Sequence, residues 1–239
     1  MADPYPHRDF ATAMAGEDTD PSATLLDRLA HDLRGPLSPL QTAAYLLRRP
    51  DLEPERRDEL LAIIDRQTTR LSAMVQEVSD WTRASKSRLV NRREAVMPAM
   101  VAELAVTSSG IDVRLDVAAA LDDITIDGDA QRLVQMLSTL LGFMRSRVGG
   151  AEIVMSAELV EEGVRIDVQA NGSPWSSGER DGVFNGAEAE PFDEGLGLRL
   201  MIARAIARAH GGSMRAAETG DGSAMIRVLL PLQRVTPEN

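Results

Sequence analysis

The sequence contains no cysteine and few aromatic residues, and each scarcity excludes a class of protein. Without cysteine the chain can form no disulfide framework, no thiolate metal site and no cysteine nucleophile. Its three histidines, His7, His31 and His210, lie far apart in the sequence, which argues against a zinc site. Aromatic residues make up only 3% of the chain, too few for the stacking platforms that bind single-stranded nucleic acid.

Long apolar runs are also missing. No stretch approaches the roughly 18 apolar residues of a transmembrane helix, and the N-terminus has no signal-peptide core. The formal net charge of −11 argues against nucleic acid or anionic lipid as the main partner. The 239 residues suffice for one large or two small domains. We therefore expect a cytoplasmic protein that binds neither nucleic acid nor membrane.

What the chain does have is a helical pattern in residues 25–47. One apolar stripe recurs at spacings of three and four, at Leu26, Leu29, Leu33, Leu37, Leu40, Ala44 and Leu47. His31 falls almost opposite this stripe, with Gly35 and Ser38 on its own face. Within a helix Pro36 costs roughly 3 kcal/mol and Gly35 about 1 kcal/mol. This defect lies one turn after the exposed His31-Asp32 pair. We therefore interpret the helix as shaped for chemistry at that pair.

A second helix is predicted from Pro54 to about Ala84, after a break around Pro50. Its apolar arc is wider than one partner helix can cover, so an antiparallel hairpin alone leaves apolar surface in water. A second copy completes a four-helix bundle, and we expect a homodimer. Residues 1–20, which show no periodicity, are predicted to be a disordered leader, and residues 21–86 the hairpin.

Beyond residue 86 strands and helices are mixed, which favours a two-layer α/β sandwich over residues 87–232 and a tail over 233–239. The patterns predict strands over residues 88–94, 111–117, 124–126, 151–159, 164–170, 213–217 and 224–230. They predict helices over residues 96–106, 129–147 and 196–210. The connection over 171–195 is too long for an ordinary loop and is typical of a functional or disordered segment.

Four motifs in order carry a family resemblance. His31-Asp32-Leu33-Arg34-Gly35-Pro36-Leu37 resembles the phospho-accepting box of bacterial histidine kinases, and residues 129–137 (DAQRLVQML) resemble the start of their asparagine box. Residues 195–198 (GLGL) and 220–223 (GDGS) are similar to their second and third glycine boxes. The resemblance covers about residues 21–232. It implies a multidomain α+β fold: a helical hairpin, paired in a dimer, followed by the sandwich shared with gyrase and Hsp90-type ATPases.

The resemblance also implies roles for single residues. His31 corresponds to the phospho-acceptor, and Asp32 to the acid that orients the ring or takes its other proton. Backbone groups at Gly172, Gly195, Gly197 and Gly222 correspond to the nucleotide site, here weak or vestigial. One turn past the histidine, where a Thr or Asn is thought to position water for dephosphorylation, this chain has Gly35.

Five positions depart from the family pattern. The asparagine that holds Mg²⁺ corresponds to Phe143, which cannot ligate a hard cation, so no metal ligand is expected. The aspartate that contacts adenine corresponds to Ala170, and Pro174 stands at a box glycine. Thr139 and Ser146 replace the box's earlier asparagine and a basic residue. A register shift that made Asn171 the adenine contact would lose the match at Gly172.

We therefore expect a phosphorelay protein that carries a phosphoryl group on His31 and exchanges it with aspartates of response-regulator receiver domains. It resembles the dimeric histidine phosphotransferases, which keep the shape of a histidine kinase, and ATP with Mg²⁺ is a cofactor only in the first of two alternatives. One alternative is a true kinase that uses ATP and Mg²⁺ to phosphorylate His31. The other is a non-enzymatic scaffold in which His31 is vestigial.

Overall fold

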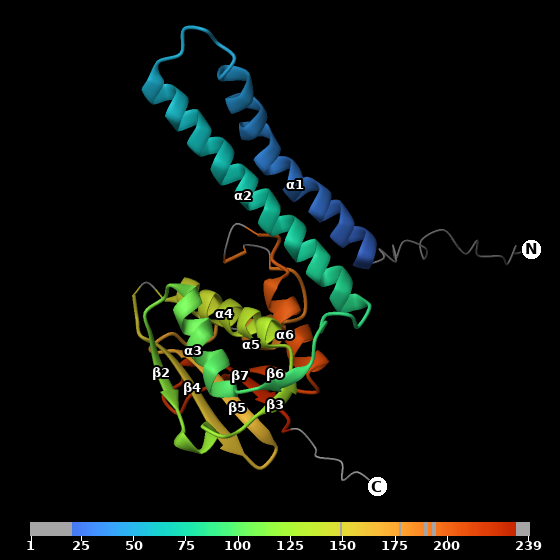
Figure 1. The fold of residues 1–239 in the computed structure, drawn as a ribbon, viewed down its shortest axis with the longest axis vertical. Coiled ribbons are helices and arrows are strands. Elements are labelled where there is room, and N and C mark those ends of the chain that lie inside the picture. Colours follow the sequence, from blue (N-terminus) through green and yellow to red (C-terminus); the bar gives the residue numbers. More distant parts are fainter. Residues whose placement is uncertain (1–20, 149, 177, 189–190, 193–194, 233–239) are drawn as a thin grey trace, which may run out of the picture.

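The chain folds into a long helical hairpin and a mixed α/β domain (Figure 1). This computed structural model describes residues 21–148, 150–176, 178–188, 191–192 and 195–232, of which residues 21–29 are described by their backbone only. The predicted leader and tail lie outside the described residues. The predicted fold class, a hairpin followed by an α/β domain, is confirmed.

The hairpin consists of α1 (Pro21–Leu46) and α2 (Pro54–Ser85), which run side by side in opposite directions (Figure 1). α1 continues through Pro36 and Pro39 although neither can donate a backbone hydrogen bond. Leu60 and Met74 of α2 are buried, and Met74 belongs to the hydrophobic core that continues into the α/β domain. Other large apolar side chains of both helices stay in water: Leu37, Tyr45, Leu61 and Val75. One hairpin therefore leaves apolar surface uncovered.

The linker after α2 leads into a small two-stranded sheet of β1 (Glu94–Val96) and β3 (Ile126–Gly128). The predicted strand over residues 88–94 is wrong, because the backbone N–H groups of Asn91 and Arg92 donate to the side chain of Asp129. Strand pairing starts only at Glu94, which lies opposite Gly128. The linker is thus tied to the domain by a carboxylate before the strand begins.

The main sheet has five strands in the order β2-β4-β5-β7-β6. They are β2 (Val113–Val117), β4 (Ile153–Val160), β5 (Gly163–Ala170), β7 (Ala224–Leu230) and β6 (Ser213–Glu218). β2 runs parallel to β4 and the other pairs are antiparallel. A short 3₁₀ turn, η1 (Ala119–Leu121), follows β2, and the short helix α5 (Glu179–Gly182) lies in the long connection after β5.

Three helices form the second layer: α3 (Pro98–Ser109), α4 (Ala130–Arg147) and α6 (Arg199–Ala209) (Figure 1). Leucines of α4 such as Leu137 and Leu140 are fully buried in one core with Ile166 and Val168 of the sheet. Asp129 caps α4 by accepting the N–H of Arg132 at 3.2 Å. α6 begins at Arg199, three residues later than predicted, because residues 196–198 form a loop whose N–H groups bond outside the helix.

Candidate functional site

His31 lies on the water side of α1, with 85% of its side chain exposed. Its Nδ1 atom is 3.2 Å from Oδ1 of Asp32. Because an ionised carboxylate only accepts hydrogen bonds, this contact assigns the ring proton to Nδ1. The lone pair is then on Nε2, the nitrogen that points away from Asp32. The pair therefore has the geometry of an oriented, solvent-accessible nucleophile.

One turn after His31, Gly35 is exposed, and a β-carbon there would meet nothing within 4 Å. The face of α1 beside the imidazole is therefore bare, and it has room for a partner or for a larger side chain.

The position that corresponds to the magnesium ligand lies inside an aromatic cluster. Phe143 of α4 is buried and stacks on Trp175, with ring centroids 6.3 Å apart, and meets the edge of Phe192 at 5.8 Å. The guanidinium of Arg147 lies 4.5 Å from the Trp175 ring centre and pairs with Glu179. Burial lowers the pKa of Arg147. Aromatic rings therefore pack against the Phe143 side chain, and the nearby carboxylate of Glu179 is paired with Arg147.

The position that corresponds to the adenine contact is Ala170, the last residue of β5, which is fully buried. Just beyond it the N–H of Gly172 donates to the hydroxyl of Ser223 at 2.9 Å. Ser223 follows Gly222, which has a φ of +84°. The fold thus brings the predicted glycines Gly172 and Gly222 to one place, through the turn between β6 and β7.

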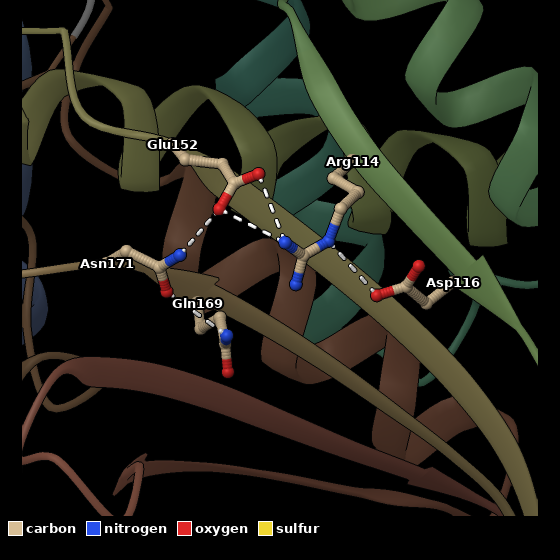
Figure 2. Close-up of polar contacts among 5 residues, drawn as sticks. All are labelled: Arg114, Asp116, Glu152, Gln169 and Asn171. Carbon is tan, nitrogen blue, oxygen red and sulfur yellow. Dashed lines mark hydrogen bonds and ion pairs between the residues drawn. The ribbon is translucent and has the colours of Figure 1, made fainter.

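The side chain of Asn171 belongs to a polar network at the end of the sheet (Figure 2). Its amide donates to Glu152 at 2.8 Å and its carbonyl accepts from Gln169 at 3.2 Å. Glu152 in turn accepts from Arg114, which also contacts Asp116 (Figure 2). Both functional groups of Asn171 are engaged with these neighbours, which gives no support to the alternative register in which it contacts a base.

Gly195 and Gly197 are buried at the start of α6. Gly197 has a φ of +75°, and a β-carbon there would lie 2.7 Å from the carbonyl oxygen of Glu188. The backbone of Glu188 also donates its N–H to the carbonyl of Gly197 at 3.0 Å. The described contact of Gly197 is therefore with a neighbouring segment of the same loop.

Sequence reasoning missed two acids on α2, Glu77 and Asp80, which are buried against the α/β domain. Glu77 accepts the backbone N–H groups of Leu196 and Leu198. Asp80 accepts from Arg132 at 2.9 Å. The partners of Glu77 lie about 120 residues away in the chain, so no local sequence pattern predicts them. The available signal was that both acids occur among the apolar positions of α2.

The helical hairpin with its exposed histidine and the α/β sandwich each match a known family of domains. Residues 22–86 match the family described as His Kinase A (phospho-acceptor) domain. Residues 128–234 match the family of histidine kinase-, DNA gyrase B- and HSP90-like ATPases. The chain therefore has the two-domain core of the two-component histidine kinases and belongs to that family.

Named relatives agree with this assignment. Sensor protein KdpD of Mycobacterium tuberculosis is 30% identical over 220 residues, which cover 85% of this chain and 25% of that protein. KdpD of Escherichia coli K12 is 28% identical over 234 residues, which cover 94% of this chain and 26% of that protein. The chain thus spans about a quarter of the length of these relatives.

Solved structures share the fold. The histidine kinase AdeS of Acinetobacter baumannii superposes with a TM-score of 0.66 at 18% identity, covering 85% of this chain and 98% of that one. The histidine kinase ThkA in complex with the response regulator TrrA has a TM-score of 0.65 at 20% identity, with 88% and 61% covered. Within the described ranges, none of the helices is both long enough and apolar enough to cross a membrane.

Proposed function

We propose that this protein is a histidine phosphotransferase: His31 takes a phosphoryl group from one receiver aspartate and passes it to another, without using ATP. Membership of the two-component histidine kinase family supports a role in this kind of signalling. The observation that favours phosphotransfer over ATP-dependent phosphorylation is the aromatic cluster around the buried Phe143.

The side chains of Phe143 and Ala170 do not supply the contacts that a magnesium ion and an adenine base need. A hard divalent cation requires oxygen ligands, and the Phe143 side chain meets the rings of Trp175 and Phe192. Ala170 has no side-chain acceptor for an adenine amino group and is fully buried. Phosphoryl transfer from ATP depends mainly on positioning and on charge neutralisation, so both losses affect the central requirements.

The His31-Asp32 pair supports the transfer step itself. The Nε2 lone pair attacks the phosphorus of an aspartyl phosphate, forming a P–N bond while the P–O bond to the aspartate breaks. The aspartate leaves as a carboxylate with the electron pair of that bond. The imidazole keeps its Nδ1 proton and becomes cationic, and the carboxylate of Asp32, 3.2 Å away, stabilises this charge. The reverse sequence hands the group to the second receiver.

The test is a phosphotransfer assay with purified components. A receiver domain carrying labelled aspartyl phosphate is mixed with wild type, with His31→Ala, and with Asp32→Asn. We expect label on wild type, none on His31→Ala, and slower labelling of Asp32→Asn. Labelled ATP with Mg²⁺ in place of the receiver is expected to leave the wild type unlabelled.

The rival functions give different results in the same assay. Stoichiometric, His31-dependent labelling by ATP alone would make the protein a kinase. Absence of labelling from every phosphorylated receiver tested, with the receivers active toward another acceptor, would favour a scaffold.

A further inference from the structure

Two acidic side chains on α2, Glu77 and Asp80, join the hairpin to the α/β domain; we call them the acid clamp. They are three residues apart and therefore share one face of the helix. Glu77 is 4% exposed and Asp80 is 1% exposed. Carboxylates are almost never buried to this extent unless charged or polar partners meet them. The partners of the clamp lie mainly on the other domain.

Glu77 occupies the N-terminal end of α6. One carboxylate oxygen, Oε2, accepts the backbone N–H groups of Leu196 at 3.1 Å and Leu198 at 3.2 Å. The other, Oε1, accepts from Nε of Arg199 at 3.2 Å. Leu198 is the N-cap of α6, so these N–H groups lie at the helix end that carries unpaired donors and a partial positive charge. Such ends bind phosphate and carboxylate groups from ligands. Here the group comes from the chain's own hairpin.

Asp80 reaches the adjacent helix. Its Oδ1 accepts from NH1 of Arg132 at 2.9 Å, and its Oδ2 accepts from Nε2 of Gln135 at 2.8 Å. Both donors are on α4, whereas the donors to Glu77 belong to α6 and the loop before it. The clamp therefore fixes two different helices of the domain on one face of α2, which defines an orientation rather than a single point of attachment.

We propose that Glu77 is an internal ligand of the anion-binding end of α6, and that with Asp80 it holds the α/β domain in one orientation on the hairpin. Glu77 and Asp80 are then positioning residues. In this role the two acids hold the domain in a fixed position against the C-terminal half of α2 (Figure 1). The consequence for catalysis rests on the proposed phosphotransfer: a receiver that docks on the hairpin meets the domain in a defined place.

The first test measures the orientation directly. Because the chain has no cysteine, Asp58→Cys on α2 and Glu162→Cys in the turn between β4 and β5 give two unique labelling sites on exposed positions. Spin labels there report the distance distribution between hairpin and domain, with excess unlabelled protein present to suppress distances between copies. We expect one narrow distribution in the parent protein and a broad one in Glu77→Gln and in Asp80→Asn.

Two further variants sharpen this test. Glu59→Gln removes an exposed acid of the same helix that pairs only locally with Arg56, and is expected to keep the narrow distribution. Arg199→Gln removes a partner of Glu77 and is expected to broaden the distribution. Because the Arg199 side chain is 37% exposed, this variant still tests the clamp if Glu77→Gln or Asp80→Asn fails to fold. Amide hydrogen exchange at Leu196 and Leu198 is expected to accelerate in Glu77→Gln.

Unchanged distance distributions in Glu77→Gln and Arg199→Gln would overturn the proposal. The phosphotransfer assay adds an independent result: as positioning variants, Glu77→Gln and Asp80→Asn are expected to raise KM for the phosphorylated receiver about tenfold with kcat preserved. A fall in kcat at unchanged KM contradicts a positioning role. Absence of phosphotransfer in the wild type refutes the proposed function, while the distance measurement still decides the clamp.

Discussion

At the scale of single residues, the environment of His210 makes stability depend on pH. Its ring is buried, accepts the N–H of Asp129 on Nε2 at 2.9 Å, and contacts the carbonyl of Ile206 through Nδ1 at 2.8 Å. Burial lowers the pKa of His210 below its usual 6.5, and the nearby charge of Arg93 acts in the same direction. The hydrogen bond to Ile206 opposes this shift but does not reverse it.

A histidine with a lowered pKa in the folded state binds fewer protons when folded than when unfolded. Its stabilising contribution is therefore present above about pH 6.5 and is lost as the pH falls below that value. We expect the urea midpoint of the α/β domain to drop between pH 7.5 and pH 5.5. The drop is expected to persist in His31→Gln, because the His31 ring is exposed in the folded protein, and to shrink in His210→Gln. An equal drop in His210→Gln would contradict this assignment.

Gly35 gives a prediction about dephosphorylation. It lies one turn past His31 and has no side chain to position water for attack on a receiver's phospho-aspartate. We therefore expect weak phosphatase activity. In the His31→Ala background, where transfer is blocked, adding Gly35→Asn is expected to raise phosphate release from a phosphorylated receiver roughly tenfold, because the site has room for the side chain. Rapid release by His31→Ala alone, without the second change, would show that water is positioned by other groups.

At the scale of elements, the loop before α6 depends on Gly197. A residue with a β-carbon must adopt a positive φ there, which costs about 1–2 kcal/mol, and must also push back the Glu188 backbone. Gly197→Ala is expected to lower the free energy of unfolding by at least that amount, measured by urea denaturation. The matched control is Gly186→Ala in the same connection, where a β-carbon meets nothing within 4 Å. Equal stability of the two variants would refute the argument.

The elements also show what the sequence can reveal. Hydrophobic periodicity predicted α1, α2, α4 and most strands, because each depends on residues that are near neighbours in the chain. The His31-Asp32 contact is between adjacent residues and was predictable for the same reason. The contacts of Phe143 with Trp175 and Phe192, and those of Glu77 with residues about 120 positions later, are set by packing of the two layers and the two domains. No short pattern encodes such pairs. The strand predicted over 88–94 failed because a side chain, Asp129, replaced the expected strand partner.

At the scale of the whole molecule, the hairpin predicts self-association. Leu61 and Val75 on α2 are 45% and 62% exposed, and Leu37 on α1 is 40% exposed. Burying a large aliphatic side chain stabilises an interface by about 1.5–3 kcal/mol, so a few of them can hold a dimer. We expect light scattering to show a dimer at micromolar concentration. Leu61→Glu with Val75→Glu is expected to give a monomer, whereas Leu104→Glu, at an exposed position on α3, is expected to remain dimeric. A monomeric wild type would rule out the interface.

The attachment of the linker to Asp129 has a mechanical consequence. Asn91 and Arg92 are bonded to the domain and Leu89 is buried in its core, so only residues 86–88 separate it from the end of α2 at Ser85. Three residues extend to about 10 Å at most. If Glu77 is displaced, the short linker still tethers the domain to α2. The effective concentration of the Glu77 carboxylate at the end of α6 is then on the order of millimolar. A free anion that binds the end of α6 has to compete with Glu77 at that concentration. Modest contacts are therefore enough to keep the domain docked on α2, and Glu77 rebinds rapidly after each release.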